Sequence, residues 1–199
     1  DVYGEDPTVN ELEQLAAEMT SKDAALFVTS GTQGNLLALL SHCERGDEYI
    51  AGVGAHTYLH EAGGGAVLGS IQPQPLPINP KGELDLDDVA AAIKPDDYHY
   101  AKTRLLCLEN TQGGKVLSIN YMQQAGEVAK KHGLKFHLDG ARVFNAAVKL
   151  EQPVSAITSL FDSVSICLSK GLAAPVGSVL VGDIETISKA RRLRKMVGG

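Results

Sequence analysis

Short apolar runs alternate with amphipathic segments along the whole chain. The strand-like runs of alternating or continuous apolar residues are at 24–28, 48–52, 103–108, 134–139, 163–168 and 176–181. Segments with apolar residues at helical spacing lie between them, at 7–19, 36–40, 85–93, 121–132, 154–160 and 184–196. Strands that alternate with helices in this way are typical of an α/β fold. The proline-rich stretch 71–86 favours an edge strand that runs into a turn.

Polar side chains follow four of the predicted strands at the point where each strand ends. They are Ser30 with Thr32, Glu109 with Asn110, Asp139, and Lys170. In an α/β sheet the carboxyl ends of parallel strands open onto the ligand crevice, so we expect these groups to share one edge. Four such strand ends are a stronger indication of a site than any one of them alone.

Lys170 and Asp139 provide an amine and a carboxylate for that edge. Gly171, Pro175 and Gly177 follow the lysine, and such residues interrupt regular structure and allow close backbone approach to a ligand. An amine that forms a Schiff base with pyridoxal phosphate needs a carboxylate near the pyridine nitrogen. Two simpler interpretations stay open, because most lysines are solvated and Asp139 is also placed to cap a helix at 141–147.

The run Ser30-Gly31-Thr32 connects a strand to a helix, and it predicts a phosphate seat made of free backbone amides at a helix start. The three spaced glycines of a dinucleotide site and the Gly-Lys-Ser/Thr of a P-loop are both missing. An ordinary capped helix is the alternative. His56 follows another strand end, where a flat ligand could lie on its ring, although a lone histidine is also compatible with a structural role.

Composition narrows the class of protein. With 199 residues, 44% of them hydrophobic, the chain can bury one substantial core. A net charge of −6 without a basic stripe argues against nucleic acid and anionic membranes as partners. No apolar run reaches membrane-spanning length. Three cysteines in apolar segments indicate a reducing compartment, and we expect a cytoplasmic protein without a metal site.

Taken together, four motifs resemble the threonine aldolases of the aspartate-aminotransferase superfamily, which bind pyridoxal phosphate. These motifs are Asp139-Gly140-Ala141-Arg142, Ser169-Lys170-Gly171 with Pro175-Val176-Gly177, Ser30-Gly31-Thr32, and the segment 1–7. The resemblance implies a mixed, mainly parallel sheet sandwiched between helices, with residues 1–199 forming a single cofactor-binding large domain. A short N-terminal segment and a C-terminal small domain of the family would lie outside this sequence.

The resemblance also implies a role for each site residue. Lys170 would form the Schiff base, Asp139 would pair with the ring nitrogen, and His56 would stack on the ring. Ser30, Gly31 and Thr32 would hold the phosphate. Arg142, His99 and Tyr3 would bind the substrate, with Arg142 near its carboxylate and the cofactor oxygen. By the same resemblance, we expect a homodimer or homotetramer, in which Lys195 could reach a neighbouring site, although a solvated helix face is the simpler interpretation of this residue.

The implied reaction is the cleavage of L-threonine or L-allo-threonine to glycine and acetaldehyde. His56, His99, a water molecule or the cofactor phosphate could accept the β-hydroxyl proton, and the sequence does not choose among them. The chain departs from the family pattern at Gln112-Gly113, where a His-Asn pair is expected. The alternatives are another enzyme of this fold, such as a β-eliminating lyase or aminotransferase, and a non-catalytic binding domain.

Overall fold

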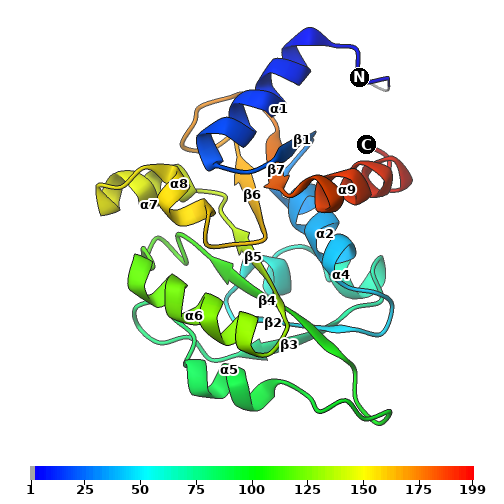
Figure 1. Ribbon diagram of the computed structural model, residues 1–199, viewed down its shortest axis with the longest axis vertical. Helices are drawn as coiled ribbons and strands as arrows, with labels where there is room; N and C mark the ends of the chain where they lie inside the picture. The colour runs from blue at the N-terminus through cyan, green and yellow to red at the C-terminus, as the bar shows by residue number, and fades with distance from the viewer. Residues whose placement is uncertain (1–2) are drawn as a thin grey trace.

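The structure, a computed structural model, describes residues 3–199, so the first two residues of the segment 1–7 lie outside it. Its centre is a seven-stranded sheet in the order β1-β7-β6-β5-β4-β2-β3 (Figure 1). The strands are β1 (Ala24–Val28), β2 (Glu48–Gly52), β3 (Gln72–Leu76), β4 (Thr103–Glu109), β5 (Lys135–Asp139), β6 (Ser163–Cys167) and β7 (Ser178–Gly182). Only β7 runs antiparallel to its neighbours, so the predicted mixed, mainly parallel sheet is confirmed.

Helices cover both faces of this sheet (Figure 1). They are α1 (Pro7–Thr20), α2 (Gly31–His42), α3 (His56–Leu59), α4 (Gly64–Val67), α5 (Leu86–Ala92), α6 (Ile119–Lys131), α7 (Val143–Leu150), α8 (Val154–Thr158) and α9 (Ile184–Met196). Helix α2 packs on α9, β6 and β7, whereas α6 packs on β5 and α8 on the other face. The sheet is therefore the middle layer of three.

The helix starts follow from local capping. Asp6, Asp85 and Asp183 each cap a helix by accepting backbone amides with the side chain, and Pro7 occupies the first helical position. Helix α7 begins at Val143 and not at residue 141 as predicted, because the preceding turn is held by hydrogen bonds of Gly140 and Ala141. Other predicted elements differ from the observed ones by a few residues at their ends.

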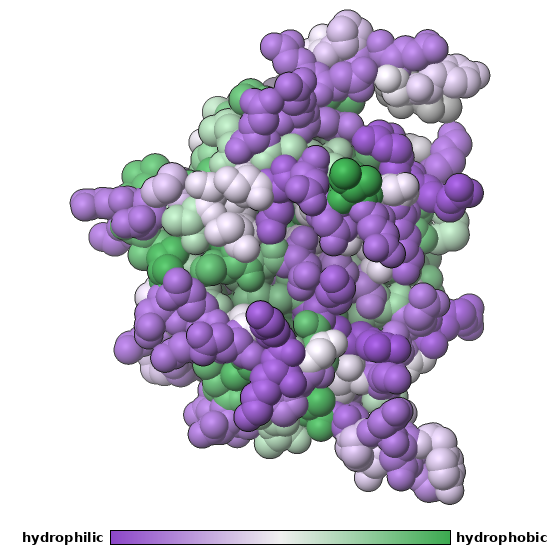
Figure 2. All heavy atoms as spheres, viewed as in Figure 1, coloured by the Kyte–Doolittle hydropathy of each residue, from purple (hydrophilic) through white to green (hydrophobic). Residues whose placement is uncertain are grey.

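The core lies on both sides of the sheet. Leu106, Leu138, Val164 and Ile166 are fully or almost fully buried among the residues that pack against α6 and α8. A second cluster between the sheet and α2 with α9 includes Leu37, which is completely buried. The face seen in Figure 2 is mostly hydrophilic, with hydrophobic residues in small separate groups. Among the described residues, no helix is long and apolar enough to span a membrane.

Strand β5 has an unusual polar face. Its side chains alternate, so Phe136 and Leu138 point to one side and His137 and Asp139 to the other. The sequence pattern groups His137 with the polar Lys135, yet His137 is completely buried because α2 covers that face. The polar face of this strand therefore lies inside the molecule, at the carboxyl edge of the sheet.

Candidate active site

A pocket of about 320 Å³ opens at the carboxyl edge of the sheet, as the sequence predicts. Segments that follow β1, β2, β5 and β6 converge on it, because these strands run in the same direction. It is lined by Thr29, Ser30, Gly31, Thr32, Asn35, His56, Asp139, Ala141, Cys167, Ser169, Lys170, Pro175, Val176 and Gly177. Its volume lies at the lower end of the range for small-molecule sites. The structure thus brings Lys170, Asp139, His56 and the Ser30 turn together.

Lys170 lies in the loop between β6 and β7, on the open side of the pocket. The loop folds back on itself, with the amides of Leu168 and Ser169 both donating to the carbonyl of Gly177. Gly177 has φ +100°, and a Cβ there would lie 2.6 Å from the Phe27 ring, so the position requires glycine. The Lys170 side chain makes no hydrogen bond or ion pair with any residue of the range 3–199. Its amine is therefore available to a ligand.

Asp139 lies on the opposite, buried side of the pocket and is only 4% exposed. Its Oδ1 accepts the amide of Ala141 at 3.0 Å, and its Oδ2 accepts from Nδ2 of Asn35 at 2.8 Å. The helix-cap interpretation is thus partly right, since Asp139 holds the turn before α7. The residue that caps α7 itself is Arg142, without a side-chain hydrogen bond. The pairing of Asp139 with a cofactor nitrogen stays a prediction.

The start of α2 forms the third wall of the pocket. Ser30 caps the helix by accepting the amide of Gln33 at 3.1 Å. The amides at the first helical positions, Gly31 and Thr32, have no partner within a helix and point out of its positive end. A Cβ at Gly31 would lie 2.7 Å from Sγ of Cys167, so glycine allows the start of α2 to pack closely on the end of β6. This end of α2 suits an anionic group.

His56 lies between the pocket and two acidic residues. Its backbone amide donates to Oε2 of Glu109, and its ring Nδ1 lies 2.8 Å from Oε1 of Glu61. The side chain is 38% exposed, whereas that of Glu61 is 3% exposed. Burial raises the pKa of Glu61, opposed by the hydrogen bonds from Asn35 and His56. The ring is therefore held at one nitrogen while its other nitrogen stays available.

Glu109 adds a titratable group behind this wall. It stands opposite Asp139 in the register of β4 and β5. Burial, together with the negative charge of Asp139, raises the pKa of Glu109 to about 7. The backbone hydrogen bond from His56 and the charge of Lys170 act in the opposite direction, so both residues lie close enough to influence this carboxyl. The buried side of the site thus contains three carboxylic groups, those of Glu61, Glu109 and Asp139.

The side chains of His56, Glu61 and Asp139 are close enough for a metal, with ligand atoms within 4.8 Å of one another. The amide of Asn35 already donates to both carboxylates at 2.8 Å. This cluster is therefore explained by hydrogen bonds between its own members, and it belongs to the wall of the pocket.

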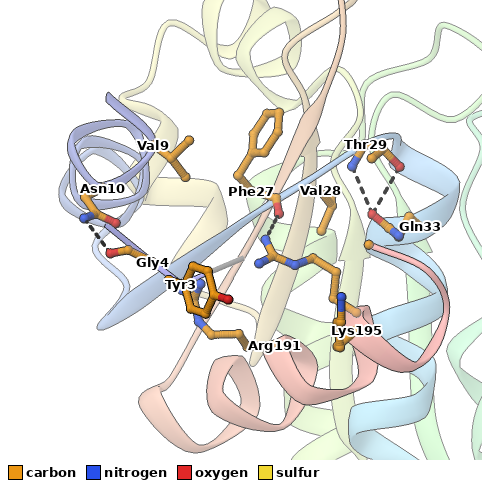
Figure 3. Close-up of a pocket in the computed structure, with 12 residues that line it drawn as sticks. Tyr3, Gly4, Val9, Asn10, Phe27, Val28, Thr29, Gln33, Arg191 and Lys195 are labelled. Carbon is orange, nitrogen blue, oxygen red and sulfur yellow. Dashed lines mark hydrogen bonds between the residues drawn. The ribbon is translucent and has the colours of Figure 1, made fainter. Parts of the chain in front are cut away.

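Three residues predicted for the substrate are placed elsewhere. Arg142 is exposed and lies next to Ala141, just outside the pocket lining. His99 is in the loop before β4, at the opposite, amino edge of the sheet, where Nδ1 lies 2.7 Å from Oδ1 of Asp97. Tyr3 lines a separate pocket of about 630 Å³ beside Arg191 and Lys195 (Figure 3). Their roles toward a substrate stay predictions.

The departure at Gln112-Gly113 lies near the pocket without entering its lining. Gln112 donates from Nε2 to the carbonyl of Gly54 at 3.1 Å, which connects the segment after β4 to the segment after β2. Gly113 has φ +55° within a turn closed by Gln112 and Lys115. In this chain the departure therefore supports the backbone ahead of His56.

Asn35, Glu61 and His137 are site residues that the sequence did not indicate. Asn35 is in the middle of a helix, and Glu61 is in a glycine-rich segment. Each contacts groups far away in the chain, such as Asp139, which is 104 residues from Asn35. The one local signal is that the polar Asn35 directly precedes the apolar run 36–40 of its helix.

The residues present fit pyridoxal phosphate. The helix start at Gly31 offers amides to a phosphate, Lys170 offers a free amine, and Asp139 offers a buried carboxylate. These groups all line one pocket, and the side chain of Lys170 has no partner within residues 3–199, which agrees with a ligand held between them. The arrangement can hold a flat anionic ligand between an amine and a carboxylate.

Comparisons with known proteins bear on the family of the chain. The family model described as beta-eliminating lyase matches residues 1–199. The low-specificity L-threonine aldolase of Escherichia coli K12 is 58% identical over 199 residues, which cover 100% of this chain and 60% of that protein. The low-specificity L-threonine aldolase of Saccharomyces cerevisiae is 41% identical over 201 residues, which cover 100% of this chain and 52% of the yeast protein.

Solved structures give the same match in three dimensions. The threonine aldolase of Leishmania major superimposes with a TM-score of 0.86 at 26% identity, covering 98% of this chain and 58% of that one. The chain therefore spans between about half and three fifths of the length of these relatives.

Proposed function

The chain belongs to the beta-eliminating lyase family, and on that premise we propose that it is the cofactor-binding part of a threonine aldolase. Its reaction is the cleavage of L-threonine or L-allo-threonine to glycine and acetaldehyde with pyridoxal phosphate. Relatives with this printed name cover the whole of the chain. The observation that carries the proposal is the pocket in which Lys170 and Asp139 lie on opposite sides.

Four groups of this chain would hold the cofactor. Ser30, Gly31 and Thr32 would bind its phosphate, His56 would face its ring, Asp139 would lie near its nitrogen, and Lys170 would bind its aldehyde. When bound, pyridoxal phosphate supplies an aldehyde that condenses with amines and a ring that accepts electrons from the bond to be broken. Asp139 contributes a fixed negative charge, which favours a protonated ring nitrogen.

Lys170 contributes a mobile amine. Because its side chain makes no hydrogen bond or ion pair within residues 3–199, its amine would be free to hold the aldehyde of the cofactor. The backbone of its loop is held by hydrogen bonds to the carbonyl of Gly177, so only the side chain of the lysine has to move. Arg142, exposed beside the pocket, would bind the substrate carboxylate.

We propose that His56 is the group of this chain that accepts the β-hydroxyl proton. Glu61 carboxylate accepts best from an Nδ1–H, and the neutral ring then has its lone pair on Nε2. That nitrogen can take a proton from a substrate hydroxyl. His99 of the same chain lies at the opposite edge of the sheet, so it would act in this way only in the site of a neighbouring subunit.

We also propose that the protein is cytoplasmic and assembles as a homodimer or homotetramer. Cys43, Cys107 and Cys167 are all buried free thiols, which agrees with a reducing compartment. Large exposed apolar side chains support subunit contacts, among them those of Tyr98, at 93% exposure, and Val67, at 75%. Lys195 would then be able to reach a neighbouring site.

The test uses the full-length protein with added pyridoxal phosphate. We expect a visible absorption band, and borohydride reduction followed by peptide mapping should place the label on Lys170. Threonine should then release acetaldehyde and glycine. Pyruvate or another keto acid in place of the aldehyde would favour a β-eliminating lyase or aminotransferase. Absence of the band would contradict the proposal as a whole.

A further inference from the structure

The Asn35 side chain lies between the two buried carboxylates of the site. Its Nδ2 is 2.8 Å from Oδ2 of Asp139 and 2.8 Å from Oε1 of Glu61. Asn35 is 1% exposed, Asp139 4% and Glu61 7%, so water does not take the place of these bonds. One amide therefore connects the carboxylate beneath the pocket with the acid that holds His56.

The chemistry of the two acids fixes which way this amide points. Ionised carboxylates only accept hydrogen bonds, and an amide NH₂ has two hydrogens to donate. The reverse orientation would turn the amide oxygen toward two carboxylate oxygens, with no hydrogen between them. The NH₂ must therefore face Asp139 and Glu61, and Oδ1 of Asn35 must find a donor on its other side.

That donor is His137, which is on the same face of β5 as Asp139. Its Nε2 lies 3.2 Å from Oδ1 of Asn35, so Nε2 carries the hydrogen. Its Nδ1 lies 2.8 Å from Oγ of Ser163, which is its partner in the register of β5 and β6. Since a neutral ring has one donor, Nδ1 accepts from the Ser163 hydroxyl. Ser163 in turn accepts from Nε2 of His42 at 2.8 Å.

Burial keeps both histidines neutral, which this arrangement of hydrogens requires. It lowers the pKa of His137 to about 3 and that of His42 to about 4. We call His42, Ser163, His137 and Asn35 the donor chain. Every hydrogen bond in it donates in one direction, from α2 through two strands and back to α2, and it ends on Asp139 and Glu61. Hydrogen bonds aligned in this way polarise one another and strengthen the last donor.

We propose that Asn35 and His137 are positioning residues for the reaction, which hold the Asp139 carboxylate and the Glu61–His56 pair in one fixed arrangement around the cofactor ring. This inference rests on the proposed function. It deepens that function by assigning to one buried amide the positions of the two groups that would lie at the ring nitrogen and at the ring face. Asn35 acts through its two acids, and His137 acts through Asn35.

A purely structural role explains the donor chain poorly. Apolar side chains of similar volume at positions 137 and 163 would fill the space between the sheet and α2 without any need for partners. The donor chain instead leads to the wall of the pocket. The buried hydroxyl of Thr158, which donates to the Thr20 carbonyl at 2.7 Å and joins α8 to α1, is an example of a bond that serves packing alone.

The experiment compares four variants of the full-length protein. Asn35→Ala and His137→Leu remove the donor chain, His137→Gln retains an N–H that can reach Asn35, and Thr158→Ala removes a buried hydrogen bond away from the site. We expect Asn35→Ala and His137→Leu to lower kcat by about 10–100-fold, as is typical when a group behind an active-site residue is lost. The visible band of the bound cofactor should shift in both, because the charge beneath its ring has moved.

The two remaining variants separate positioning from folding. His137→Gln should restore kcat to within a few-fold of the native value, whereas Thr158→Ala should lower Tm and leave both kcat and the band unchanged. Asn35→Ala with a native band and a kcat within twofold of native would overturn the proposal. A loss of activity that follows Tm alone in all four variants would overturn it as well.

A measurement that needs neither cofactor nor substrate tests the donor chain itself. Long-range ¹H–¹⁵N spectra of histidine-labelled protein, assigned with His137→Gln, should show His137 as the neutral Nε2–H tautomer throughout pH 5–8. The Nδ1–H tautomer would contradict the donor chain even if Asn35→Ala fails to fold. If the native protein neither binds pyridoxal phosphate nor releases aldehyde, the proposed function fails, and the tautomer still decides the hydrogen-bond arrangement.

Discussion

The two halves of the candidate site are built in opposite ways. The buried half, made of Asp139, Glu61, Asn35 and His137, consists of side chains at most 7% exposed and joined by hydrogen bonds. The open half, made of Ser169, Lys170 and Val176, is exposed, and Val176 is 61% exposed. The carboxylates of the buried half are held by hydrogen bonds, whereas the amine of Lys170 has no such partner within residues 3–199. Changes in the two halves should therefore separate activity from stability.

The largest effect is expected from Lys170→Ala. Without the amine, activity should fall by ~10³-fold or more, because the residue that forms and breaks the bond to the cofactor is gone. Unfolding free energy should change by less than about 0.5 kcal/mol, since the side chain is exposed and unpartnered within residues 3–199. Aldehyde-release assays and chemical denaturation check both. Lys170→Arg, which retains the charge, should be as inactive, and an active arginine variant would contradict the role.

Asp139→Asn should have the next largest effect. The variant can still accept from Asn35, but it lacks the negative charge, so kcat should fall on the order of 10²–10³-fold. Asp162→Asn is a matched control, because Asp162 also accepts a backbone amide, that of Phe136 at 2.7 Å, at the other edge of the sheet. Activity in the control should stay within about twofold of native. Equal losses in the two variants would mean that the buried half acts through folding alone.

Glu61→Gln should have a smaller effect, on the order of 10–100-fold in kcat, because His56 loses the charged acceptor at Nδ1 and is no longer held in one tautomer. Steady-state kinetics with threonine measure it. Glu83→Gln is the control, because it changes a carboxylate that accepts from Asn79 at the surface. Its kcat should equal that of the native protein. Native kinetics in Glu61→Gln would contradict the role of Glu61 in holding the ring of His56.

The smallest effect concerns stability alone. The pKa of Glu109 is raised from 4.5 to about 7 by burial, so the folded state retains a proton that the unfolded state loses. Stability of the apoprotein should therefore fall as pH rises from about 4.5 to about 7 and level off above that, by up to about 1–3 kcal/mol. Glu109→Gln should flatten this slope in denaturation curves. A slope that persists in the variant would assign it to another group.

The open half was predictable from the sequence, and the buried half largely was not. Lys170, Ser30 and His56 each follow a strand, and the direction of parallel strands was enough to bring them together with Asp139, the one member of the buried half that the sequence indicated. Asn35 and Glu61 are within or beside helices, and their partners depend on how α2 lies on the sheet. His137 looks like a surface position of an alternating strand, and only the layer of α2 over that face buries it.

The residues expected at the substrate show the same limit. Arg142 could be placed near the pocket because it follows Asp139 within one turn. His99 and Tyr3 belong to segments that lead to the amino edge or to a second pocket, and no local pattern indicates where such segments lie. The resemblance to a family therefore carried their assignment, and experiments on the assembled protein must test it.

The contacts of Asn35 also bear on how the protein reaches its native state. The bonds of the donor chain join residues that are 102, 104 and 121 positions apart. Loop closure over such distances belongs to the slow, late part of folding. During synthesis, α2 leaves the ribosome long before β5 and β6, so the side chain of Asn35 cannot form these hydrogen bonds until both strands have been made. Capture of the cofactor should therefore report completed folding, and a nascent chain that ends before Ser163 should not bind it.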